Sequence, residues 1–162
     1  MTFRTKAEGG EQALSHKEYL AFLHLILDTD CADLLDIEFF TAGADLPKLV
    51  EQAHSAGVAV VCSSHDFTKT PPRAELVSRM VQMQQAGADL PKLAVMPRCR
   101  SDVLELLAAT AEMADHHPET PVITMSMGAL GAVSRLAGET FGSAMTLSLI
   151  HISEPTRLQL IS

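Results

Sequence analysis

The sequence has no apolar run near the roughly 18 residues that a membrane-spanning helix needs, and its N-terminus lacks the charged-then-apolar order of a signal peptide. These absences predict a soluble, cytoplasmic protein. Basic residues are also scarce: twelve Lys and Arg stand against twenty Asp and Glu, for a net charge of −8 with no basic stripe. Nucleic acid and anionic membranes are therefore disfavoured as partners, and a small molecule is favoured.

Cysteine and glycine patterns of the usual cofactor sites are missing as well. The three cysteines, Cys31, Cys62 and Cys99, are odd in number and widely spaced, which favours reduced thiols over a disulfide framework or a zinc site. His116 and His117 precede a proline without a third metal ligand nearby, and no glycine fingerprint of a dinucleotide follows a strand. The residue pattern therefore favours neither a zinc site nor a dinucleotide site.

The chain does have a regular alternation of strand and helix signals, and its 47% hydrophobic content argues for a folded core. Ser15, Asp45 and Ser101 are predicted to cap helices, and a further helix is expected at residues 73–85. The predicted strands are residues 34–40, 58–62, 92–96 and 121–127. This order indicates an α/β fold with parallel strands and crossover helices.

Lys92 is the most unusual residue, because it lies in the apolar, strand-like segment at residues 90–97, LPKLAVMP. A poorly solvated lysine loses part of its preference for the charged form, and the neutral amine can attack a carbonyl to form a Schiff base. The same heptapeptide, GADLPKL, also occurs at residues 43–49, where Lys48 enters a predicted helix. Only Lys92 is therefore a candidate for imine chemistry. The alternative is a lysine that extends from the end of a strand into solvent.

Three polar residues that lie in the predicted strands or just after one, Glu38, His65 and Lys92, follow one another at intervals of 27 residues, one strand and one helix per step. Successive units of this kind bring their inward-facing groups to one mouth of a (β/α) barrel, whereas an open doubly wound sheet is the rival architecture. His65 is predicted to follow a strand and suits general acid/base catalysis. Asp36 and Glu38 are expected to be satisfied polar residues of the barrel interior.

Six short motifs extend this pattern. They are TFRT at residues 2–5, EGGE at 8–11, SHDF at 64–67, PKL at 91–93, TMSMG at 124–128 and SRLAGE at 134–139. In this order and spacing they resemble type I 3-dehydroquinate dehydratase, over roughly residues 1–147. The resemblance implies a (β/α)8 TIM barrel that converts 3-dehydroquinate to 3-dehydroshikimate in the shikimate pathway. It implies no metal or external cofactor, and a homodimer in bacterial forms.

Carried onto this chain, the resemblance assigns the Schiff-base lysine to Lys92, the general acid/base to His65, and the neighbouring carboxylate to Glu8. It assigns substrate binding to Arg4 and Arg135, whose guanidinium groups can hold a carboxylate bidentately. Met127 would supply an apolar wall of the pocket. Without the resemblance, Glu8 would read as an ordinary loop carboxylate and either arginine as a surface residue.

Two parts of the family pattern have no counterpart: the early strands, with a Glu-x-Arg motif, and the closing segment with its Ser and Gln. Residues 147–162 do not follow the family. We therefore predict an incomplete barrel domain at residues 1–146 and a tail at 147–162 outside the native fold, and we expect little activity from the chain as written. A class I aldolase and a non-catalytic remnant are the competing interpretations.

Overall fold

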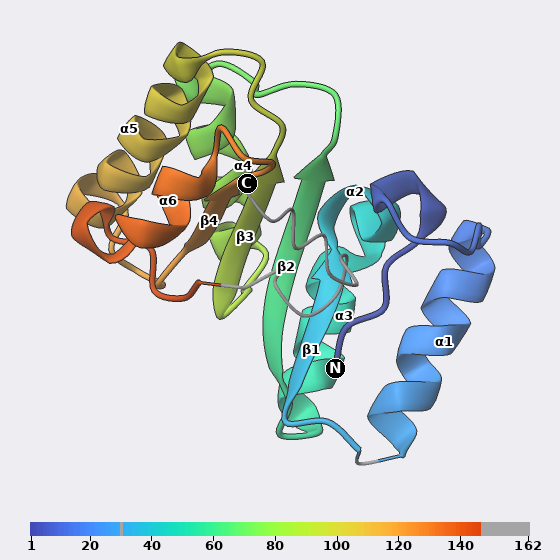
Figure 1. The fold of residues 1–162 in the computed structure, drawn as a ribbon. Coiled ribbons are helices and arrows are strands. Elements are labelled where there is room, and N and C mark those ends of the chain that lie inside the picture. Colours follow the sequence, from blue (N-terminus) through green and yellow to red (C-terminus); the bar gives the residue numbers. More distant parts are fainter. Residues whose placement is uncertain (30, 147–162) are drawn as a thin grey trace, which may run out of the picture.

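The computed structural model describes residues 1–29 and 31–146, which form one parallel sheet with its connecting helices (Figure 1). The strands are β1 (Leu34–Glu38), β2 (Ala59–Asp66), β3 (Leu90–Val95) and β4 (Ile123–Ser126). The α-helices are α1 (His16–Asp28), α2 (Phe39–Ala42), α3 (Leu46–Ser55), α4 (Arg73–Gln85), α5 (Arg100–His116) and α6 (Ala132–Leu136). Short 3-10 turns are η1 (Lys6–Glu8), η2 (Gly43–Asp45) and η3 (Glu139–Phe141).

The strands lie in the sheet in the order in which they occur in the chain, β1-β2-β3-β4, and all neighbours are parallel. Single parallel bridges continue this arrangement at both edges, since Thr2 pairs with Asp36 and Ser143 pairs with Val122. In an open doubly wound sheet the strand order reverses at a switch point, but the order of these four strands has no reversal. The prediction of part of a (β/α) barrel is therefore confirmed. In such a barrel each strand lies next to the strand that precedes it in the chain.

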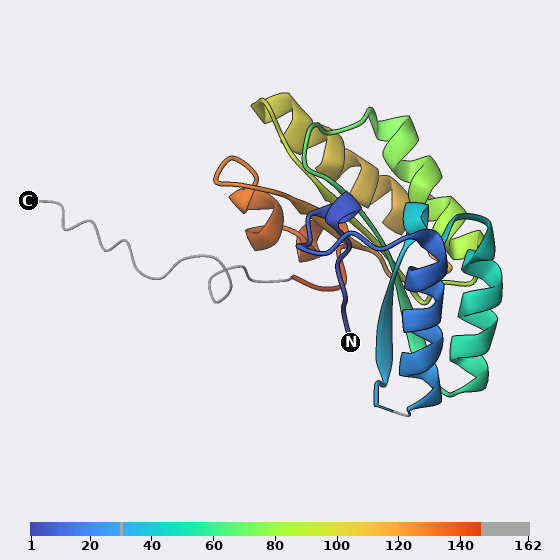
Figure 2. The ribbon, with the colours of Figure 1, turned by 90° about the vertical axis from the view of Figure 1, so that its right-hand side faces the viewer.

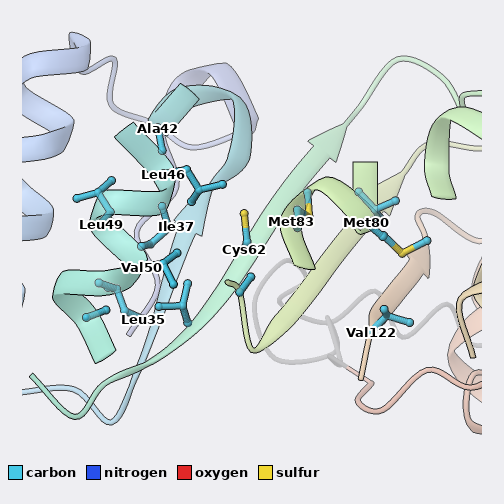
Figure 3. Close-up of a cluster of buried hydrophobic side chains, with 14 of the residues drawn as sticks. Leu35, Ile37, Ala42, Leu46, Leu49, Val50, Cys62, Met80, Met83 and Val122 are labelled. Carbon is cyan, nitrogen blue, oxygen red and sulfur yellow. The ribbon is translucent and has the colours of Figure 1, made fainter. Parts of the chain in front are cut away.

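The main core lies between the sheet and its helices. Figure 2 shows α1, α3, α4 and α5 together on one side of the sheet. Figure 3 shows the side chains that meet there: Leu35 and Ile37 from β1, Cys62 from β2, and Met80 and Met83 from α4. These residues are between 0% and 1% exposed. Because side chains alternate along a strand, the residues between them face the opposite, inner side of the sheet.

The predicted capping residues account for only some of the helix starts. The capping box predicted at Ser15 is present, with the Ser15 side chain accepting from the Glu18 N–H. Asp45 is the N-cap residue of α3, as predicted, but its side chain makes no capping hydrogen bond, and the predicted cap at Ser101 is wrong. Helix α5 begins at Arg100, and its N-cap is Cys99, two residues before Ser101. The Asp45 carboxylate lies 2.8 Å from His16 Nε2. A tertiary partner therefore competes with the local cap for the same carboxylate.

The predicted strand bounds also differ from the observed ones, including those of β3, expected at residues 92–96, and β4, expected at 121–127. The strand expected at residues 34–40 ends at Glu38, because the Glu38 carboxylate accepts from Thr41 Oγ1 at 2.7 Å and the chain turns into α2. The strand expected at residues 58–62 continues to Asp66. Ser63, polar in sequence, is fully buried and hydrogen-bonded inside the sheet, so polarity does not end the strand there. His65 consequently lies within β2 and not after it.

The predicted division into residues 1–146 and a tail at 147–162 stays a prediction, because the tail lies outside the described residues. Within the described part, no helix is both long and apolar enough to cross a bilayer.

Tyr19 offers a test of how α1 is fastened to the sheet. Its side chain is 0% exposed, and its hydroxyl accepts a hydrogen bond of 2.8 Å from the Glu38 N–H. We expect Tyr19→Phe to lower the free energy of unfolding by about 1–3 kcal/mol, because it leaves a buried N–H without a partner. Urea denaturation of the 162-residue chain measures this. The control Phe40→Leu alters an exposed ring and should change stability by less than about 0.5 kcal/mol; equal effects would contradict the assignment.

Candidate active site

Three neighbouring strands bring polar groups to the inner face of the sheet. The register pairs Glu38 of β1 with Ser63 of β2, and Ser63 with Lys92 of β3. His65 pairs with Ala94, two residues further along the strands than Lys92. The equal intervals of 27 residues therefore do not mean equal heights in the sheet, since the lengths of the connections set the register.

Lys92 is buried, with 6% of its surface exposed, and its Nζ donates to Asp36 Oδ2 at 3.0 Å. The alternative, a lysine extending from a strand end into solvent, does not fit this exposure. Burial alone would raise the pKa of Asp36, but the charges of Lys92 and Arg4 and a hydrogen bond from Ser63 hold it below its ordinary value. Asp36 is thus the counter-ion that makes a lysine acceptable here.

Arg4 joins this ion pair from the N-terminal segment. Its Nη2 lies 2.7 Å from Asp36 Oδ2, and its Nη1 donates to Ser63 Oγ at 2.8 Å and to Glu38 Oε1 at 3.4 Å. Its Nη1 also lies 3.6 Å from Glu8 Oε2. The guanidinium, predicted to bind substrate, is therefore engaged with side chains of three elements, and it adds positive charge beside Lys92.

Glu38 has a different task. Its carboxylate is 0% exposed and accepts from the Thr5 N–H at 2.8 Å and from Thr5 Oγ1 at 2.7 Å, in addition to Thr41 Oγ1. These bonds fasten the N-terminal segment and α2 to β1. Glu38 is a satisfied interior carboxylate, whereas its neighbour on the same face, Asp36, contacts the candidate nucleophile.

Glu8 and His65 form a buried pair, with Glu8 Oε2 2.8 Å from His65 Nδ1. Burial raises the pKa of Glu8 to about 8, reinforced by the negative charge of Glu38. Burial and the positive charges of Arg4 and Lys92 lower the pKa of His65 to about 3. The site therefore favours an uncharged imidazole next to a protonated carboxyl group at neutral pH. Such an imidazole can exchange a proton with a bound molecule.

A hollow of about 470 Å³ adjoins this pair, lined by Ala7, Glu8, His16, Phe40, Thr41 and His65. Glu8 Oε1 is buried and has no hydrogen-bond partner among the residues that the structure describes. No group of three or more His, Cys, Asp or Glu side chains in that part of the chain is arranged to hold a metal ion.

Two predicted site residues, Arg135 and Met127, make no side-chain hydrogen bond or ion pair with this cluster in the part of the chain that the structure describes. Arg135 is in α6, where its Nε and Nη2 are buried without a hydrogen-bond partner among residues 1–29 and 31–146. Met127 follows β4 and packs in a small apolar group with Ala94, Ile123 and Met125. The structure thus brings together Arg4, Glu8, His65 and Lys92, and it places Arg135 and Met127 on the next unit of the fold.

Sequence reasoning missed Asp36 as the partner of Lys92. A usable signal was present: Leu35 and Ile37 are apolar and flank it, so Asp36 must face the side of the sheet opposite the helices. A carboxylate buried there needs a cation, and Lys92 is the lysine predicted to lie in a strand.

This chain is similar to known proteins of one family. A family model described as type I 3-dehydroquinase matches residues 1–159. The 3-dehydroquinate dehydratase of Clostridium kluyveri is 50% identical over 161 residues, 98% of this chain and 63% of that protein. The one from Salmonella agona is 48% identical over 149 residues, 92% and 59% of the two chains.

Two solved structures are similar throughout the described fold. The 3-dehydroquinate dehydratase from Enterococcus faecalis superposes with a TM-score of 0.86 at 48% identity, covering 90% of this chain and 60% of that one. The type I enzyme from Clostridium difficile, solved with covalent modified comenic acid, gives 0.85 at 48% identity, covering 89% and 57%. The chain spans less than two thirds of the length of these relatives.

The raised pKa of Glu8 predicts how stability depends on pH. A carboxyl group whose pKa rises from 4.5 to about 8 on folding stabilises the fold below 4.5, and this contribution is lost as the pH approaches 8. We expect the free energy of unfolding of the chain to fall by about 1–2 kcal/mol relative to that of its Glu8→Gln variant between pH 7 and 8.5, where His65 is mostly uncharged in the folded and unfolded states. Urea denaturation at several pH values tests this, and parallel curves for the two proteins would contradict it.

Proposed function

The chain belongs to the type I 3-dehydroquinase family, and from this premise we propose that its site dehydrates 3-dehydroquinate to 3-dehydroshikimate through a Schiff base on Lys92. His65 is the general acid/base, and Glu8 orients it. One observation carries the proposal: the amine of a lysine that is 6% exposed lies 3.0 Å from the Asp36 carboxylate, on the sheet face that also holds His65.

The first step needs a neutral amine. The proton that Lys92 carries leaves to solvent, while the Asp36 carboxylate, 3.0 Å from Nζ, holds the amine in position. The freed Nζ attacks the substrate ketone, and loss of water from the adduct leaves an iminium ion. The iminium group acts as an electron sink, which makes a proton on the carbon next to the imine carbon removable.

His65 then takes that proton, and the resulting electron pair expels the β-hydroxyl group, which leaves as water after it is protonated. Hydrolysis of the iminium releases the product and restores Lys92. The net change is the loss of one water molecule from the substrate. Glu8 Oε2, 2.8 Å from Nδ1, fixes the ring so that the other nitrogen faces the reacting groups.

Other parts of the proposal concern binding and location. Arg4 and Arg135 are proposed to hold the substrate carboxylate, with Met127 as an apolar wall, by resemblance to the family. Unpaired Cys31, Cys62 and Cys99 suit the reducing cytoplasm. The substrate is the proposed partner, without nucleic acid or membrane, and a homodimer is expected from the family. The Clostridium difficile relative with covalent modified comenic acid gives a precedent for covalent chemistry in a similar fold.

Lys92 should trap substrate and Lys48 should not, because Lys92 is buried beside Asp36 while Lys48 lies exposed on α3. In a chimera in which residues 1–146 replace the matched segment of the Clostridium kluyveri relative, we expect borohydride reduction with 3-dehydroquinate to leave an adduct on the peptide containing Lys92, detected by mass spectrometry. Lys92→Ala should abolish this adduct, and the matched variant Lys48→Ala should retain it. An adduct on Lys48 alone would refute the assignment.

His65 should govern turnover. The same chimera allows kcat to be measured from the absorbance of the conjugated enone product. We expect His65→Ala to lower kcat by about 10²–10⁴-fold, the usual effect of removing a general acid/base. His54→Ala, which changes an exposed histidine paired with Asp89, serves as the control. Near-normal turnover of His65→Ala would mean that another group transfers the proton. Cleavage of a carbon–carbon bond of the substrate by the chimera would indicate an aldolase.

A further inference from the structure

We propose that Phe67 is a positioning residue that holds the plane of the His65 imidazole, and that Gly9 supplies the space in which Phe67 lies. This inference rests on the proposed role of His65. It starts from an aromatic side chain that is 46% exposed and that none of the proposed steps uses. The Phe67 ring lies against the His65 ring with a centroid distance of 6.3 Å and an interplanar angle of 16°.

A single hydrogen bond cannot fix an imidazole. The bond between His65 Nδ1 and Glu8 Oε2 restrains one atom at 2.8 Å but leaves the ring free to tilt about that contact. An offset, nearly parallel aromatic neighbour removes this freedom, because tilting would lose the stacking contact. The Glu8 carboxyl group and the phenyl ring thus restrain different motions of the same side chain.

The position of Phe67 is itself controlled by the residue before it. Asp66 Oδ1 accepts from the Thr68 N–H at 2.9 Å, from Thr68 Oγ1 at 2.7 Å and from the Lys69 N–H at 3.0 Å. These bonds hold the turn that follows β2 and therefore the backbone on which Phe67 is carried. In the motif SHDF, His65 acts, Asp66 anchors the turn, and Phe67 covers the imidazole.

Gly9 lies close to the Phe67 ring. It follows Glu8 directly and has a positive φ of 90°. A Cβ at this position would lie 2.4 Å from Cε2 and Cζ of the Phe67 ring, closer than any real contact. Two adjacent residues of one turn therefore reach His65 by separate routes, Glu8 through the ring nitrogen and Gly9 through the phenyl ring.

The chain provides matched variants for a test. Gly9→Ala introduces both backbone strain and a clash with Phe67, whereas Gly57→Ala places alanine at a φ of 74° with no atom within 4 Å. Phe67→Leu removes the flat ring but keeps an apolar side chain, and Phe67→Tyr keeps the ring. Because Phe67 is partly exposed, neither variant at this position should unfold the chain.

The first measurement uses the 162-residue chain without substrate. Nuclear magnetic resonance follows the exchange with water of the proton shared by Glu8 and His65. We expect exchange about ten times faster or more in Phe67→Leu and in Gly9→Ala, and near the wild-type rate in Phe67→Tyr and Gly57→Ala. Adding Gly9→Ala to Phe67→Leu should change the rate less than twofold, because both act through one ring. Wild-type exchange in Phe67→Leu, or independent effects in the double variant, would overturn the inference.

Kinetics of the chimera separate positioning from substrate contact. Phe67→Leu should lower kcat by about 10–100-fold with KM nearly unchanged, since misplacing a catalytic group by about 1 Å costs on the order of 10² in rate. A raised KM with normal kcat would mean that Phe67 contacts substrate and would overturn the inference. The proposed function is tested separately by His65→Ala: if that variant turns over normally, the function fails, whereas the exchange measurement still decides whether the stack holds the ring.

Discussion

The structure depends on neutralising two cations, Arg4 and Lys92, on the inner face of a sheet. Water solvates neither fully, so each needs a carboxylate within contact distance. Asp36 serves both through the same oxygen, at 2.7 Å from Arg4 and 3.0 Å from Lys92. The shared carboxylate links the N-terminal segment, β1 and β3. The same atoms therefore form the candidate site and hold these three parts of the fold together.

The same constraint explains why Glu8 and His65 favour uncharged forms. Asp36 and Glu38 already supply negative charge opposite the two cations, and a further carboxylate would lack a counter-ion. Burial and Glu38 accordingly raise the pKa of Glu8, while burial, Arg4 and Lys92 lower that of His65. The outcome is an uncharged imidazole beside a buried amine, a combination suited to moving protons on an imine.

Comparison of the predicted and observed elements shows where local patterns suffice. The capping box at Ser15 and the helix at Arg73–Gln85 were predicted correctly, because their signals act within a few residues. The roles of the Asp45 and Ser63 side chains were misjudged, because their hydrogen-bond partners are distant in the chain. The Asp45 carboxylate binds His16, 29 residues away, and Ser63 is satisfied by Arg4, 59 residues away, so neither behaves as its local sequence suggests.

From the amino-acid order alone it followed that strands and helices alternate, that Lys92 differs from Lys48, and which family the motifs resemble, because periodicity and motif order are properties of contiguous residues. The tertiary structure decided which carboxylate neutralises Lys92, that His65 lies within β2, and that Arg4 contacts Asp36, Glu38 and Ser63. These facts depend on the register between strands and on burial. Both are set by packing among residues distant in the chain, which no local pattern encodes.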